Sequence, residues 1–85
     1  MDDLVRGRLR NFAIGAAVQR MRRDRGLDDY RLARQVRIST KTLLDYESGE
    51  EAIPAAKLFE IAEVLAVPIE ELLQDFADVA HLLRD

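Results

Sequence analysis

Apolar side chains recur at every third or fourth position along most of this chain, which is the spacing that places them on one face of an α-helix. The first clear helix is predicted from about Phe12 to Arg25, with an apolar face made of Ile14, Ala17, Val18 and Met21. Gly26 is expected to end this helix, because glycine readily adopts the left-handed backbone conformation that commonly follows a helix.

Two short helices are predicted next. Asp28 is suited to cap the second helix, whose inward positions are Leu32, Ala33 and Val36. Ser39 is suited to cap a third helix from about Thr40 to Glu47, whose inward positions are Leu43 and Tyr46. Gly49 is expected to end the third helix.

A fourth and a fifth helix complete the pattern. Pro54 and Pro68 each stand where a helix accepts a residue without an N–H. The stripe after Pro54 consists of Leu58, Ile61, Ala62 and Leu65. The stripe after Pro68 keeps helical spacing nearly to the last residue, through Ile69, Leu72, Leu73, Phe76, Val79, Ala80 and Leu83. The sequence therefore predicts an all-α protein of five helices, the last of them extended.

The length and the composition narrow the possibilities further. Eighty-five residues suffice for one domain with a modest core. The chain has no cysteine and a single histidine, His81, so we expect no disulfide, no metal site and no cofactor. The N-terminus is too charged for a secretory signal, and no apolar run approaches the ~20 residues that span a bilayer. We therefore expect a soluble cytoplasmic protein without a membrane partner.

The net charge of −3 hides an uneven distribution along the chain. Residues 1–37 hold ten arginines against five acidic residues, whereas residues 38–85 hold three basic residues against eleven acidic ones. Nucleic-acid affinity depends on basic side chains that neutralise phosphates, so a DNA-binding surface must draw on the first half. A second interpretation is that the basic first helix lies against the acidic C-terminal part of the same chain.

Over residues 14–73 the sequence resembles the Xre family of phage repressor and Cro-type helix-turn-helix proteins. The resemblance is carried by Ile14-Gly15, Met21-Arg22, Gly26-Leu27, Leu32-Ala33, Ile38-Ser39, Leu43, Glu47, Gly49, Pro54, Leu58, Ile61-Ala62, Leu65, Val67 and Leu72-Leu73. It implies a lambda-repressor-like fold of five helices, in which the second and third helices read double-stranded DNA, usually as a homodimer. It also implies that Arg22 and Glu47 form a structural ion pair that orients the third helix.

The same resemblance indicates which side chains contact DNA. Base edges are expected to meet the outer face of the third helix, at Thr40, Lys41, Leu44 and Asp45. Ser39, besides capping that helix, is expected to reach a phosphate. The phosphate contacts are expected from Arg31, Arg34 and Arg37, and from the N-terminal residues Arg6, Arg8 and Arg10. The alternatives are that Lys41 is an ordinary solvated lysine and that Leu44 belongs to a protein interface.

The chain departs from the family at three places that bear on DNA binding. Asp29 stands where the family commonly has a glutamine that contacts phosphate, and an acidic side chain there is repelled unless it turns away. Glu50 and Glu51 lie in a loop that often approaches phosphate. Arg37 replaces the turn glycine, so it must either adopt a left-handed conformation or reshape the turn.

The two ends of the chain lie outside the helix-turn-helix domain, which is assigned to residues 12–73. Residues 1–11 are predicted to form an arm or a short helix, with Leu4, Val5, Leu9 and Phe12 as an apolar stripe. Residues 74–85 are predicted to extend the fifth helix and to offer a dimer interface made of Phe76, Val79, Leu82 and Leu83. The two apolar surfaces either pack on each other within one chain or form a two-fold interface between chains.

These features favour a sequence-specific transcriptional regulator that binds DNA as a homodimer. The alternative is a protein-interaction module that has kept the fold while its DNA face has become acidic, for example an antitoxin-like protein or one that sequesters a regulator. Its motivation is the set of acidic residues around the reading helix together with Leu44. No nucleophile motif or phosphate-binding glycine loop occurs, so the sequence does not predict an enzyme.

Overall fold

Helices account for most of the structure, a computed structural model that describes residues 3–74. The helices are α1 (Asp3–Asp24), α2 (Asp29–Gln35), α3 (Thr40–Ser48) and α4 (Ala55–Leu65). A further helical segment covers residues 69–74. The proposed interface residues Phe76, Val79, Leu82 and Leu83, and the extension of the fifth helix, lie outside the described residues. The all-α fold predicted from the sequence is confirmed.

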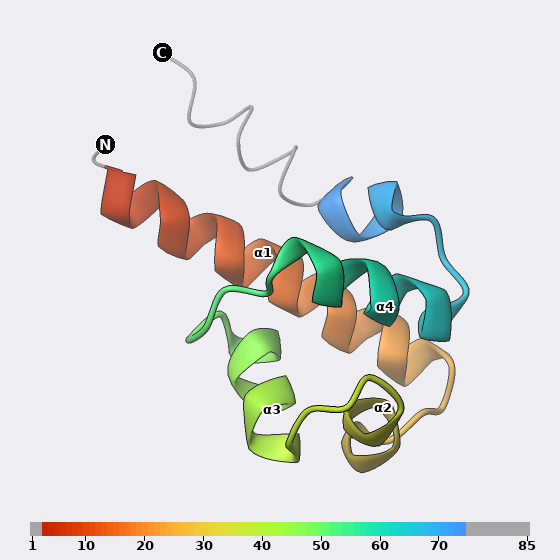
Figure 1. Cartoon of the computed structure of the whole chain (residues 1–85). Helices are drawn as coiled ribbons and strands as arrows, with labels where there is room; N and C mark the ends of the chain where they lie inside the picture. The colour runs from red at the N-terminus through yellow and green to blue at the C-terminus, as the bar shows by residue number, and fades with distance from the viewer. Residues whose placement is uncertain (1–2, 75–85) are drawn as a thin grey trace.

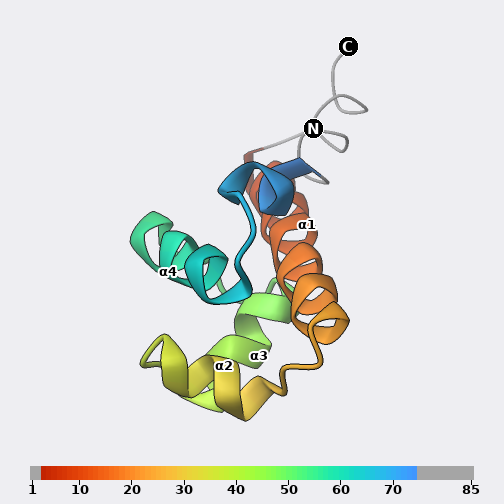
Figure 2. The same cartoon turned by 90° about the vertical axis from the view of Figure 1, so that its right-hand side faces the viewer.

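The helices pack around one core. Figures 1 and 2 show α2 and α3 together at the end of the molecule away from the N-terminus, with α4 alongside α1. The most deeply buried side chains come from every part of this arrangement, namely Val18, Leu32, Val36, Leu43, Ile61, Leu65 and Leu72. The inward positions predicted for α2 and α3 are all buried. No helix within residues 3–74 is long and apolar enough to cross a membrane.

The helix ends follow local rules that the sequence had indicated. Asp28 and Ser39 accept hydrogen bonds from the backbone N–H groups three residues later, at 2.8 and 3.0 Å, and so cap α2 and α3. Gly26 and Gly49 both have positive φ, as predicted for residues that end a helix. Pro54 is the residue just before α4.

The first helix differs from the prediction at its beginning. It starts at Asp3 and runs without interruption to Asp24, so residues 3–11 form neither a separate arm nor a separate short helix. The apolar spacing of Leu4, Val5 and Leu9 continues into that of the core-facing residues, and no proline intervenes to stop the helix. The basic residues of this segment are therefore fixed on a rigid element.

The crossing of α1 and α3 depends on Gly15. A Cβ atom at this position would overlap the carbonyl oxygen of Tyr46 and lie 2.8 Å from that of Glu47. Both atoms belong to the backbone of α3, so they cannot move aside as a flexible side chain could. The absence of a side chain at Gly15 thus sets how closely the two helices approach.

We predict that Gly15→Ala lowers the free energy of unfolding by about 1–3 kcal/mol, because α3 has to move away from α1. The matched control is Gly7→Ala in the same helix, where an added Cβ meets no atom within 4 Å. This substitution should raise the free energy of unfolding by about 0.5–1 kcal/mol, because alanine is the better helix former. Urea denaturation followed by circular dichroism measures both, and equal effects of the two changes would contradict the role of Gly15.

Candidate nucleic-acid interface

The turn between α2 and α3 is closed by hydrogen bonds of the Schellman type. The N–H of Ile38 donates to the carbonyl of Ala33 at 2.9 Å, and the N–H of Arg37 donates to that of Arg34 at 3.2 Å. Arg37 has a φ of 60°, which is the left-handed conformation that its place in the turn requires. Of the two possibilities left open by the sequence, the chain keeps the turn and places arginine in a conformation that favours glycine.

The side chain of Lys57 also holds this turn. Its Nζ donates to the carbonyl of Val36, at the end of α2, over 2.7 Å, and to Glu60 Oε2 over the same distance. A cation at the C-terminal end of a helix stabilises the carbonyls that lack partners there. Lys57 is a residue that the sequence analysis missed. It lies 21 positions from Val36, and no local pattern connects the two.

A buried ion pair fixes the other end of α3. Arg22 Nε and Nη2 donate to the two carboxylate oxygens of Glu47 at 2.7 and 3.0 Å, and both residues are buried, with 7% and 4% of their surfaces exposed. Arg22 Nη1 also donates to the carbonyl of Leu27 at 3.0 Å. The hydrogen bond to Glu47 raises the pKa of Arg22. The two residues that the family resemblance pairs therefore lie together, and they join α1 to the C-terminal end of α3.

The residues expected to read bases lie along the opposite side of α3. Ser39, Lys41 and Leu44 are exposed, while Thr40 and Asp45 are partly exposed. Lys41 Nζ donates to Asp45 Oδ2 at 2.7 Å, and this hydrogen bond raises the pKa of Lys41. The cation and the anion at the centre of the predicted reading face therefore form an ion pair with each other.

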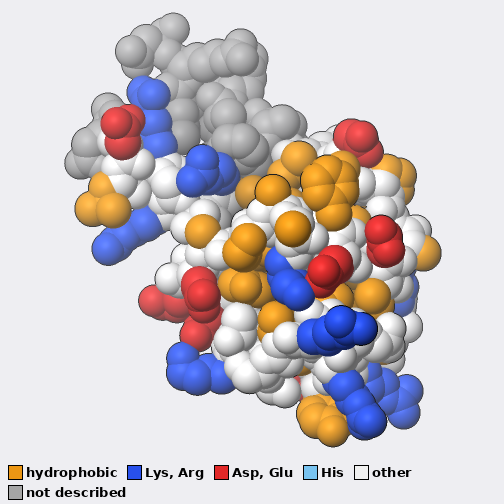
Figure 3. All heavy atoms as spheres, viewed as in Figure 1, with side chains coloured by type: hydrophobic (Ala, Val, Ile, Leu, Met, Phe, Trp, Pro, Cys, Tyr) orange, Lys and Arg blue, Asp and Glu red, His pale blue; other side chains and the backbone are white. Residues whose placement is uncertain are grey.

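Basic side chains of α2 and the turn lie beside this face. Figure 3 shows lysine and arginine side chains gathered at the end of the molecule where α2 lies. Arg31, Arg34 and Arg37 are all exposed. Arg31 Nε lies 3.7 Å from Asp28 Oδ2, whereas among residues 3–74 neither Arg34 nor Arg37 has an ion pair through its side chain. Two cations next to α3 are therefore available to a phosphate.

The acidic residues at the start of α2 are engaged locally. Asp28 caps the helix, and Asp29 Oδ1 accepts a hydrogen bond from the N–H of Tyr30 at 2.7 Å. Carboxylates are favourable at a helix N-terminus, where the exposed N–H groups carry partial positive charge. Glu50 and Glu51 remain exposed beyond the far end of α3.

The arginines at the front of the chain are not brought to this surface. Arg6, Arg8 and Arg10 lie on the first half of α1, which is at the end of the molecule away from α2 in both views (Figures 1 and 2). The expectation that they contact phosphates beside α3 treated residues 1–11 as a separate arm or short helix, whereas the continuous helix fixes them on the first half of α1. The phosphate contacts near α3 are left to Arg31, Arg34 and Arg37.

Two short helices joined by a tight turn, with the beginning of the second helix exposed, define a lambda-repressor-like helix-turn-helix domain. A family profile described as helix-turn-helix matches residues 18–72. The chain therefore belongs to this helix-turn-helix family, and the Xre-type resemblance is confirmed.

Individual relatives agree with this assignment. The chain is 37% identical over 62 residues to an uncharacterized transcriptional regulator in the ATPase CF(0) region of Rhodospirillum rubrum. That match covers 73% of this chain and 57% of the relative, so the chain spans little more than half of its length.

Two crystal structures of the clp gene regulator ClgR from Corynebacterium glutamicum are similar in fold, each with 26% identity. The match to the first has a TM-score of 0.76 and covers 81% of this chain and 90% of the ClgR chain. The match to the second has a TM-score of 0.78 and covers 85% of this chain and 77% of the ClgR chain.

We predict that Arg22→Met lowers the free energy of unfolding by about 3–5 kcal/mol, because the Glu47 carboxylate then remains buried without its partner. The double variant Arg22→Met/Glu47→Leu should recover a large part of this loss. Arg31→Met, which removes an exposed cation from a long ion pair, serves as the control and should change stability little. Urea denaturation measures all three. A double variant as unstable as the sum of both single variants would contradict coupling between the two charges.

Proposed function

We propose that this chain binds double-stranded DNA sequence-specifically, with the N-terminal half of α3 in the major groove, and that two copies bind neighbouring half-sites. The observation that carries the proposal is the exposed beginning of α3 with two cations beside it, Arg34 and Arg37, that form no ion pair within residues 3–74. A helix of this kind fits the major groove, where each base pair presents a distinct pattern of donors and acceptors.

The chemistry of the outer face suits base recognition. Lys41 donates to the N7 and O6 of guanine, and Asp45 accepts from the N4 of cytosine. Thr40 bonds a base edge or packs on a thymine methyl, and Leu44 makes apolar contact with another thymine methyl. Ser39 contacts a phosphate. The Lys41–Asp45 ion pair opens when these partners replace it, so bases that match neither side chain leave the pair closed.

Few phosphate contacts imply a modest affinity for each half-site, and one that salt readily weakens. Pairing of two copies compensates, because binding of the second copy is then effectively intramolecular. Regulation follows from occupying a promoter or from contacting polymerase there. No chemical step is needed.

We predict that duplexes selected from a random pool share a half-site sequence, and that Lys41→Ala weakens binding to the selected duplex at least fivefold, or about 1 kcal/mol. Thr40→Ala should alter the preference at one base pair. Phe59→Ala, at an exposed aromatic side chain on α4, is the control and should leave binding unchanged. Fluorescence anisotropy at several salt concentrations measures the affinities.

The absence of selective binding even at low salt would overturn the proposal. Recovery of a stoichiometric protein partner under those conditions would instead select the protein-interaction module, for which exposed Leu44 and the acidic residues Asp45, Glu50 and Glu51 provide the surface.

We also predict that Arg37→Gly has opposite effects on stability and on DNA binding. Glycine relieves the left-handed strain, which raises the free energy of unfolding by about 1 kcal/mol. Loss of one phosphate contact lowers the slope of log Kd against log salt by about one. Ala66→Gly is a matched control, because Ala66 ends α4 in the same conformation, with a φ of 56°. It should stabilise the fold similarly and leave DNA affinity unchanged, and equal DNA affinity of both variants would exclude Arg37 from the interface.

A further inference from the structure

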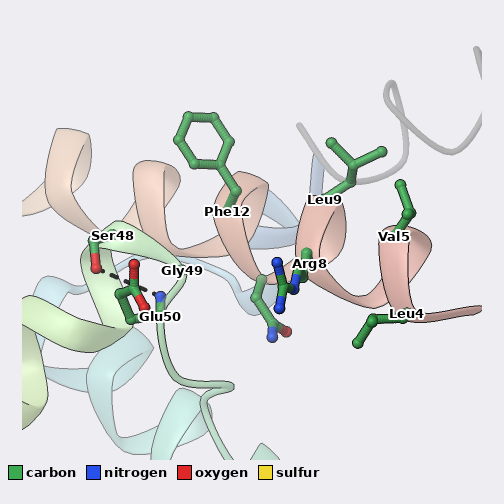
Figure 4. A pocket seen from close by; sticks show the side chains of 9 residues that line it. Leu4, Val5, Arg8, Leu9, Phe12, Ser48, Gly49 and Glu50 are labelled. Carbon is green, nitrogen blue, oxygen red and sulfur yellow. Dashed lines mark hydrogen bonds between the residues drawn. The ribbon is translucent and has the colours of Figure 1, made fainter.

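A groove lies between the first half of α1 and the loop that follows α3. It has a volume of about 630 Å³, and its lining includes Leu4, Arg8 and Phe12 on one side and Ser48–Glu50 on the other. Figure 4 shows the loop beside the helical turn that carries Phe12. The contact is tight, because a Cβ atom at Gly49 would lie 2.8 Å from the Cα of Phe12. The groove is therefore a preformed feature of the surface.

The apolar part of this groove is exposed to an unusual extent. Leu4 and Phe12 are 66% and 61% exposed, the highest values among the exposed large apolar side chains of residues 3–74. Leu4 lies one helical turn before Arg8, and Phe12 lies one turn after it, so the three side chains form one stripe along α1. Large apolar side chains that remain exposed along one groove favour a contact surface there.

The charges around the groove indicate which partner it fits. Arg8 and Glu50 are exposed, and among residues 3–74 neither side chain has a hydrogen bond or an ion pair. One cation and one anion beside an apolar centre make a surface that is complementary to a second copy of itself. Arg6 and Arg10 do not oppose such pairing. They follow Leu4 by two and six positions, and at about 100° per residue they lie on the opposite side of α1.

The position of the groove also suits two copies bound to one DNA duplex. It adjoins the C-terminal end of α3, whereas the proposed base contacts begin at the N-terminal end. Pairing at this groove therefore leaves the N-terminal ends of both α3 helices free to contact DNA.

We infer that two copies of this chain pair through a surface made of Leu4, Arg8, Phe12 and Ser48–Glu50, here called the α1–loop surface. The two α1 helices pack across a two-fold axis, and Arg8 of each copy forms an ion pair with Glu50 of the other. This inference deepens the proposed function, because it rests on the proposed pairing and names the surface that performs it. It shares Leu4 and Phe12 with the N-terminal apolar stripe that the sequence predicts, and it does not use the predicted interface residues Phe76, Val79, Leu82 and Leu83.

Sedimentation equilibrium of the full chain without DNA tests the inference. The wild-type chain should be dimeric. Arg8→Glu and Glu50→Arg each place like charges together twice across the interface, so each should raise the dimer dissociation constant at least tenfold. The double variant Arg8→Glu/Glu50→Arg restores opposite charges and should recover most of the wild-type affinity. Tyr30→Ala, which changes an exposed aromatic side chain on α2, should have no effect.

Three results would overturn the inference. The first is a wild-type chain that stays monomeric at every concentration. The second is a double variant no better than the single variants, although circular dichroism shows all of them folded. The third is a dimer that Phe76→Asp dissolves but the changes at Arg8 and Glu50 do not, which would place the contact in residues 75–85.

The inference and the DNA-binding proposal fail in different ways. A dimer that responds to the charge exchange but binds no duplex supports the α1–loop surface and refutes DNA reading by α3. A monomer that still depends on Lys41 for duplex binding refutes the surface and supports the reading helix. Measurement of both properties on the same variants separates the two.

Discussion

The buried ion pair between Arg22 and Glu47 is the constraint on which the placement of α3 depends. Through this pair α1 holds the C-terminal end of α3, a helix of only nine residues. A buried charge pair contributes little net stability compared with apolar side chains of similar size, but its geometry is strict, since each partner alone would be costly. Together with the close backbone contact at Gly15, it sets both the distance and the direction of α3 relative to α1.

The opposite end of α3 is held by different means. There the chain relies on the Ser39 cap, on the backbone hydrogen bonds of the turn, and on Lys57 reaching across from α4 to the last turn of α2. All three act on main-chain atoms. The side chains on the outer face of α3 therefore do not hold the fold together, and Lys41 and Asp45 form an ion pair with each other. This separation lets the proposed reading face vary while the fold is kept.

The sequence allowed much of this fold to be predicted, because most of the information is local. Caps such as Asp28 and Ser39 act over three residues, and the inward positions of α2 and α3 follow from helical spacing alone. The pairing of Arg22 with Glu47 came only from the family resemblance, since 25 positions separate them.

Other features could not be predicted for the same reason. The contact of Lys57 with Val36 has no local signature, and whether Arg37 kept or reshaped the turn depended on the sum of the surrounding packing. The uninterrupted first helix was missed because the family pattern begins near residue 14, which suggested a boundary that the chain does not have.

The Lys41–Asp45 pair has a consequence for the search through a genome. Arbitrary DNA attracts proteins mainly by charge, and every base pair of a chromosome competes for a regulator in this way. If Lys41 contacts DNA as proposed, its pairing with Asp45 makes it attract such DNA less than an unpaired lysine would. In the proposed role, the chain has a lower affinity for non-specific DNA and a higher selectivity for its own sites. Fewer copies are then held on irrelevant sequence, and more remain available for the sites that match.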